Sequence, residues 1–215
     1  TKVDSIENNK IIEIIIEIYR RVCQTYGHIT QQTPDRNVVF VHKSFQMFLG
    51  EISSYEKTLL QNKLLNKKFY FPDLLLEKYA VWKEGGYELD IDKYRDLYYA
   101  TNFDSGIEHE KLCHEYLEGI QWVLSYYTRG VPNWTWMFKH HHAPFAHTLA
   151  EYVPTFKFPA YAKTIPSSPF RQLLSVLPPK SSDLIPSHLN LLLSSSNSVL
   201  APFCPDKLII DLAGK

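Results

Sequence analysis

Hydrophobic side chains recur at three- and four-residue steps through the first 128 residues, which is the spacing of helices with one apolar face. The most regular segment is 107–128, where Cys113 and Leu117 share such a face. The apolar run IIEIIIEI predicts a well-buried helix over 4–26. The other helices predicted in this part cover 41–49, 53–66, 72–83 and a segment from Asp90 or Asp92 to Ala100.

Residues that start and stop helices support these assignments. Gly27 is placed to end the first helix in a left-handed turn. Ser53 and Glu56 have the spacing of a capping box, in which a hydroxyl and a carboxylate satisfy free backbone N–H groups. Gly85 and Gly86 are expected to stop the helix over 72–83.

The second part of the chain is rich in proline. Eleven of the 13 prolines lie at or after Pro132, and proline lacks the N–H that a helix interior needs. This part is therefore predicted to consist of loops with short helices over 168–177 and 186–193 and a strand over 207–211. The predicted fold class is mainly α, with long irregular loops and few short strands.

Charge and cysteine content narrow the class of protein. The 23 Lys and Arg balance the 23 Asp and Glu, so the global charge gives no attraction to nucleic acid or to a membrane. The run 11–18 is too short to span a bilayer and contains Glu13 and Glu17. Three scattered cysteines favour a reducing compartment. Thr1, in place of an initiator Met, indicates a processed chain or an excised fragment.

The sequence lacks the residue patterns of a catalytic centre. Metal-dependent phosphoryl chemistry needs several convergent carboxylates, and those after residue 128 are few and far apart: Glu151, Asp183, Asp206 and Asp211. Neither a GxSxG turn nor a phosphate-binding glycine loop is present. No residue of this chain is therefore assigned a catalytic role.

Three consecutive histidines, His140, His141 and His142, raise the question of a metal site. Consecutive side chains diverge in a helix or a strand, and the surrounding loop 129–147 contains no Cys or carboxylate. No metal site is predicted here. The simpler interpretation is a partly exposed polar loop with one ordered histidine.

Trp134 and Trp136 lie in the same loop, between Pro132 and Pro144. In an extended run both indoles would share one face. They could plug a core, or they could form a platform on which nucleobases stack. We expect at least one of the two rings to be exposed to solvent.

Three stretches resemble the eukaryotic 5′→3′ exoribonucleases, the XRN family. EYLEGIQWVLSYYTRGVPNWTWMFKHHHAPF at 115–145 is similar to a family helix followed by an SW-x-W loop. PSSPFRQLLSVLPPKSSDLIP at 166–186 and FCPDKLIIDLAGK at 203–215 resemble two further family motifs. The resemblance implies that 106–215 is the second conserved region of the nuclease module and that 1–105 is a helical connector.

The resemblance also implies a function. The parallel sheet, the Mg²⁺-binding carboxylates and the 5′-phosphate pocket of the family belong to the first conserved region, so this chain would be the C-terminal part of a larger α/β module. It would shape the channel for 5′-monophosphorylated single-stranded RNA and be inactive alone. The implied RNA contacts are Trp134 and Trp136, with Arg129 and His141 as neighbours.

Two alternatives to the nuclease interpretation remain. One is a non-catalytic RNA-binding or scaffold module of the same descent, since MFKHHHAP departs from the family's YYPYHYAP. The other is a purely structural helical domain. If the family interpretation holds, apolar surface on 11–18 and 107–128 should stay exposed for the first conserved region of the same enzyme. The motif details favour a cytoplasmic over a nuclear location.

Overall fold

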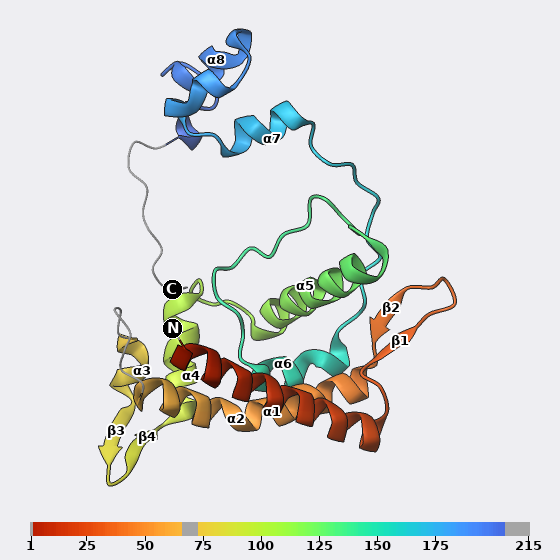
Figure 1. Cartoon of the computed structure of the whole chain (residues 1–215), viewed down its shortest axis with the longest axis vertical. Coiled ribbons are helices and arrows are strands. Elements are labelled where there is room, and N and C mark those ends of the chain that lie inside the picture. Colours follow the sequence, from red (N-terminus) through yellow and green to blue (C-terminus); the bar gives the residue numbers. More distant parts are fainter. Residues whose placement is uncertain (1, 66–72, 205–215) are drawn as a thin grey trace. The chain divides into compact units, whose positions relative to one another are not determined.

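The computed structural model of the chain describes residues 2–65 and 73–204, with side chains from residue 11 onward (Figure 1). It divides into two compact units, Thr1–Lys163 and Thr164–Lys215. Helices predominate, and the described residues contain two antiparallel sheets of two strands each. The predicted mainly α class is therefore confirmed, whereas the division of the module at 105/106 remains a prediction.

The first helix, α1 (Lys2–Tyr26), ends at Gly27 with φ 86°, as predicted. It lies along α2 (His42–Leu65), as Figure 1 shows. Ile18 and Val22 are buried, while Ile12 is 54% exposed. The prediction of a well-buried helix is wrong, because α1 buries one stripe against α2 and leaves the rest of its apolar surface exposed.

A hairpin that the sequence patterns did not predict connects α1 to α2. Its strands are β1 (Thr30–Gln32) and β2 (Val38–Phe40), with Gln31 opposite Val39. Phe40 is stacked on Phe45 of α2 with 4.2 Å between ring centroids. This contact brings the hairpin into the core of the first unit.

The predicted break between two helices near residue 50 is absent, since α2 runs unbroken through Ser53. The capping box is wrong: the Ser53 hydroxyl donates to the Gly50 carbonyl at 2.7 Å, a bond made inside a helix. Glu56 binds groups outside α2 instead. A capping signal was overridden because α2 packs along its length on α1 and α6 (Ala146–Tyr152).

The helix predicted over 72–83 is shorter than expected. Asp73 caps α3 (Leu74–Lys78) by accepting from the Leu76 N–H at 3.1 Å. The chain then forms a hairpin of β3 (Ala80–Lys83) and β4 (Gly86–Leu89). Gly85, at φ 93°, makes the turn that the pattern had assigned to a helix stop.

Two further helices match their predictions. Asp90 caps α4 (Ile91–Asn102), with its carboxylate 3.3 Å from the Lys93 N–H. α5 (His109–Arg129) ends at Gly130, which has φ 94°. The core between α2, α5, α6 and η1 (Val153–Thr155) consists of Phe40, Phe45, Leu49, Cys113, Leu117, Leu149, Val153 and Phe156.

Apolar surface remains exposed on α1 and α5, as predicted. On α1 these residues are Ile12, Ile15 and Ile16, and on α5 they are Val123, Tyr126 and Tyr127. No helix among the residues that the structure describes is long and apolar enough to cross a bilayer.

The second unit contains the predicted short helices. They are α7 (Pro169–Val176) and α8 (Ser187–Ser194), joined by η2 (Pro179–Leu184) and followed by η3 (Ala201–Phe203). In its described part, the buried hydrophobic side chains are those of Ile185 and Leu193. The strand predicted over 207–211 lies outside the described residues.

Candidate functional site

The tryptophan-containing loop runs from the end of α5 to the start of α6 and is held near its beginning by Asn133. The Asn133 Oδ1 accepts from the backbone N–H groups of Thr135 and Trp136, both at 2.8 Å. Its Nδ2 donates to the Ala162 carbonyl at 3.1 Å. These bonds bend the chain at 134–135, so the predicted extended run, with both indoles on one face, is wrong.

Trp136 packs onto α5. Its ring is stacked on Trp122, with centroids 6.1 Å apart and planes at 23°. It also lies directly over Gly119, where an added Cβ would come within 2.7 Å of the indole Cη2. A hydrogen bond to Glu118 fixes the side chain further. Trp136 is therefore a packed residue of the first unit.

Trp134 differs, because 53% of its surface is exposed. The prediction that at least one of the two rings faces solvent is confirmed for Trp134. Tyr127, in the last turns of α5, is 81% exposed. The exposed aromatic surface of this region thus includes one loop indole and rings at the end of α5.

Three aromatic rings form a column along α5 that sequence analysis missed. Tyr126 is stacked on Trp122 at 5.6 Å and 10°, and Trp122 is stacked on Trp136. The Trp122 Nε1 donates to the Asn133 carbonyl at 3.0 Å, which fixes the middle ring. The detectable signal was the spacing of Gly119, Trp122 and Tyr126, which places them near one face of a helix.

Arg129 lies at the end of α5 and contacts the turn between β1 and β2. One Nη donates to the Asp35 carbonyl at 3.3 Å and also bonds the Asn37 Oδ1. The Thr33 hydroxyl is the main cause that lowers the pKa of Asp35, and the Arg129 charge contributes. Arg129 is thus a positioned cation beside the loop.

The three histidines have different environments. His140 lies 3.2 Å from the Glu115 carboxylate, and its ring is near Phe103. His142 packs against Tyr98, with ring centroids 6.1 Å apart. His141 is exposed. No group of three or more His, Cys, Asp or Glu placed to hold a metal ion occurs in the described ranges.

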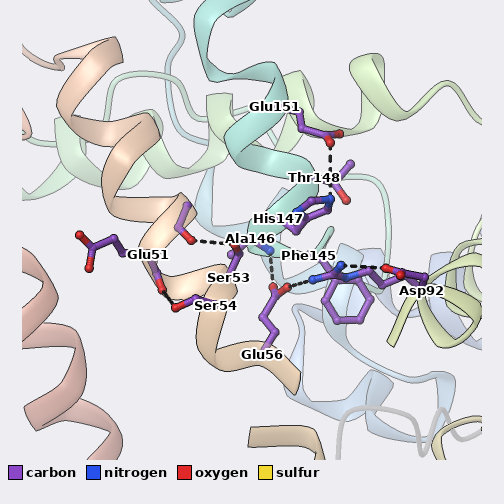
Figure 2. A network of polar contacts seen from close by, with 12 residues as sticks. Glu51, Ser53, Ser54, Glu56, Asp92, Phe145, Ala146, His147, Thr148 and Glu151 are labelled. Carbon is purple, nitrogen blue, oxygen red and sulfur yellow. Dashed lines mark hydrogen bonds and ion pairs between the residues drawn. The ribbon is translucent and has the colours of Figure 1, made fainter. Parts of the chain in front are cut away.

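The end of the loop is held by a polar network shown in Figure 2. Glu56 of α2 accepts from the Ala146 N–H at 2.6 Å and from Arg95 Nη2 at 2.8 Å. Arg95 also lies 5.6 Å from the centre of the Phe145 ring and 3.5 Å from Asp92. Side chains of α2 and α4 thereby hold the last residue of the loop, Phe145, and the first residue of α6, Ala146.

Tyrosines of α4 add to this anchor. The Tyr98 hydroxyl donates to the Ala143 carbonyl at 2.8 Å. The Tyr99 hydroxyl accepts from the Phe145 N–H and donates to Thr148, both at 2.9 Å. Burial raises the pKa of Tyr98 to about 12, so the group stays a neutral donor. The loop is therefore fixed at both ends while Trp134 faces solvent.

The charge around the loop is uneven. Beneath Trp136, burial and then the nearby charge of Glu115 raise the pKa of Glu118. Beyond Asn133, a cavity of about 530 Å³ is lined by residues that include Arg129 and Lys163. A polyanion at this loop would therefore be repelled on the glutamate side, while on the other side the positive charges of Arg129 and Lys163 are partly offset by Asp35.

The four residues predicted to contact RNA differ in their surroundings. Trp134 is exposed, Trp136 is packed on α5, Arg129 is bonded to the hairpin turn, and His141 is exposed on the same loop. Their contacts with RNA remain predictions.

Comparisons with known proteins show which family this chain is related to. The family model described as the Xrn1 helical domain matches residues 82–215. The 5′-3′ exoribonuclease 2 of Aspergillus fumigatus is 38% identical over 141 residues, which is 63% of this chain and 12% of that protein. The 5′-3′ exoribonuclease 2 of Schizosaccharomyces pombe is 39% identical over 127 residues, 57% of this chain and 12% of its own length.

A homologue from Caenorhabditis elegans, 5′-3′ exoribonuclease 2 homolog, is 36% identical over 129 residues, or 57% of this chain and 13% of the relative. The chain thus spans 12–13% of the length of these relatives. The matched region contains α5, the aromatic column and the anchored loop. Since the family model covers more than half of its residues, the chain belongs to the 5′→3′ exoribonuclease (XRN) family.

Proposed function

We propose that this chain is the part of a 5′→3′ exoribonuclease that shapes the path of 5′-monophosphorylated single-stranded RNA. The observation that carries the proposal is the exposure of Trp134, 53%, on a loop fixed at both ends. Its relatives are named as 5′-3′ exoribonucleases, which supports RNA as the ligand.

The loop that presents Trp134 is rigid, which favours binding. An exposed indole on a mobile loop would lose conformational entropy on binding, whereas this loop is already ordered by Asn133 and Glu56. Stacking of a base on an aromatic ring contributes about 1–3 kcal/mol and tolerates any base. Such a contact suits an enzyme that must move along RNA of every sequence.

The catalytic step belongs to another part of the protein in this proposal. The carboxylates that would hold Mg²⁺ lie in the first conserved region, outside this chain, and that region would cover the exposed apolar surface of α1 and, on α5, Val123. Mg²⁺ would supply charge stabilisation to the phosphate being cleaved. Here the chain contributes binding and orientation of the RNA.

We therefore expect the purified 215-residue chain to leave RNA intact. The assay is incubation with 5′-monophosphorylated single-stranded RNA in Mg²⁺, with and without EDTA. Degradation that EDTA abolishes would place the metal-binding carboxylates in this chain and contradict the proposal.

Replacing Trp134 with alanine in the complete natural protein should slow degradation of 5′-monophosphorylated RNA at least tenfold. This corresponds to about 1.4 kcal/mol, the lower range of one base stack. The matched control is Trp82→Ala, which removes an indole of similar exposure, 61%, from the β3–β4 hairpin. The measurement is the single-turnover rate, with a thermal melt of each variant.

If both variants degraded RNA at the rate of the unaltered protein, the proposed stacking role of Trp134 would be contradicted. A different outcome is that the complete protein binds RNA with an affinity that depends on Trp134 and yet degrades none of it. That result would support the alternative of a non-catalytic RNA-binding module. The two outcomes are separated by measuring affinity and degradation on the same preparations.

A further inference from the structure

We propose that Tyr126, at the end of the aromatic column, provides a second base-stacking surface in addition to Trp134. The inference rests on the proposed function, since it assigns the ligand as an unpaired nucleobase of the same RNA strand. It adds a binding residue that lies on α5 and not on the tryptophan loop.

The geometry of the column leaves part of the Tyr126 ring accessible. The Tyr126 and Trp122 planes are 10° from parallel and their centroids are 5.6 Å apart, so the two rings are stacked with an offset. Tyr126 is nevertheless 45% exposed. The exposed part of the phenol ring is the surface offered to a base. A base placed there would continue an existing stack with nearly the same orientation.

The Tyr126 ring lies against a neighbour that is already ordered. Trp122 is fixed by its bond to the Asn133 carbonyl and by its stacking on Trp136. Tyr127 contacts Tyr126 edge-on, at 5.4 Å and 67°. Binding a base would therefore cost little side-chain entropy at Tyr126, which is the condition for a stack to add affinity.

A positive charge lies near the Tyr126 ring. Arg129 is three residues after Tyr126 and so lies one helical turn further along α5. The hairpin turn holds its guanidinium in place. A nucleotide whose base stacks on Tyr126 would bring its phosphate toward this cation and away from the glutamates near Trp136.

The cation near Tyr126 favours RNA over a protein segment as the occupant. An apolar protein surface over Tyr126 would leave Arg129 without an anionic partner of its own, whereas a positioned cation near an aromatic ring is the combination that binds single-stranded nucleic acid. Cover by another part of the same protein is an outcome that the experiment must detect.

The test uses the complete natural protein and 5′-monophosphorylated oligoribonucleotides with one abasic nucleotide moved along the strand. Tyr126→Ala should weaken binding of intact RNA about tenfold. At one abasic position the same substitution should have no further effect, because the stacking partner is already missing. This coupling between ring and base is the readout that a structural role would not produce.

Tyr126→Phe keeps the ring and should bind like the unaltered protein. Trp82→Ala is the matched control, since it removes an exposed ring of the β3–β4 hairpin that is not in the column. Trp134→Ala should show its own abasic position, different from that of Tyr126. A Trp134 effect without a Tyr126 effect would overturn this inference and leave the proposed function intact.

Two other results would also overturn the inference. One is weaker binding by Tyr126→Ala that is equal at every abasic position, together with a lower melting temperature, which would mean that the ring packs against protein. The other is an equal loss of affinity in Tyr126→Ala and Trp82→Ala, which would mean a general surface effect.

Discussion

Glu56→Ala is expected to destabilise the first unit by about 3–5 kcal/mol, the usual cost of removing one partner from a buried ion pair. The Glu56 and Arg95 side chains are 12% and 15% exposed. Without the Glu56 carboxylate, Arg95 would keep only the exposed Asp92 at 3.5 Å, and its Nε already has no hydrogen-bond partner in the described part of the chain. The Ala146 N–H would lose its acceptor as well. Urea unfolding of the chain gives the free-energy change.

Glu51→Ala is the control on the same helix. Glu51 pairs with Arg21, but its side chain is 34% exposed and that of Arg21 is 45% exposed. Such a solvent-screened pair contributes little to stability. If Glu56→Ala and Glu51→Ala had similar small effects, the network in Figure 2 would not be what anchors the loop. Replacing Glu56 and Arg95 together by Leu and Met should recover much of the loss, since no unpaired charge then remains.

Trp136→Ala is expected to cost about 2–3 kcal/mol of unfolding free energy, somewhat less than a fully buried tryptophan. The substitution removes the ring that covers Gly119 and stacks on Trp122, and it removes a hydrogen bond to Glu118. The measurement is again urea unfolding. Trp134→Ala, at the exposed indole two residues earlier, should change stability by less than about 0.5 kcal/mol.

Gly119→Ala tests the same contact from the opposite side. Alanine at an interior helix position is usually favoured over glycine by about 1 kcal/mol. Here the added methyl would lie 2.7 Å from the Trp136 ring, so the indole or the helix must shift. We expect no gain in stability and a change in indole fluorescence. A gain near 1 kcal/mol with unchanged fluorescence would show that Trp136 does not rest on Gly119.

The fold was predictable wherever periodicity and an end signal agreed. α5 has a regular apolar pattern closed by Gly130, and α4 has Asp90 as its cap, and both were predicted within a few residues. The failures occurred where tertiary contacts override local signals. Ser53 has the sequence of a cap, yet α2 continues through it because both sides of that helix are packed.

The candidate site was predictable in its residues and not in its geometry. The sequence identifies Trp134 and Trp136 as neighbours on a proline-bounded loop. The two indoles would share one face only if this part of the chain were extended. The Asn133 side chain prevents this, because it accepts hydrogen bonds from two backbone N–H groups and bends the backbone. An Asn before the first Trp was the available signal for such a turn. The ties of Glu56 and Tyr99 to the loop join residues 90 and 46 positions apart, and no local pattern encodes them.

The aromatic column restricts how α5 can change length during evolution. Each residue added to a helix turns everything after it by about 100°. One insertion between Gly119 and Trp122 would rotate Trp122 and Tyr126 away from the indole that rests on Gly119. Substitutions at exposed positions such as Val123 leave this phase unchanged. Descendants of this chain should therefore vary α5 by exchanging residues, and should place insertions and deletions elsewhere.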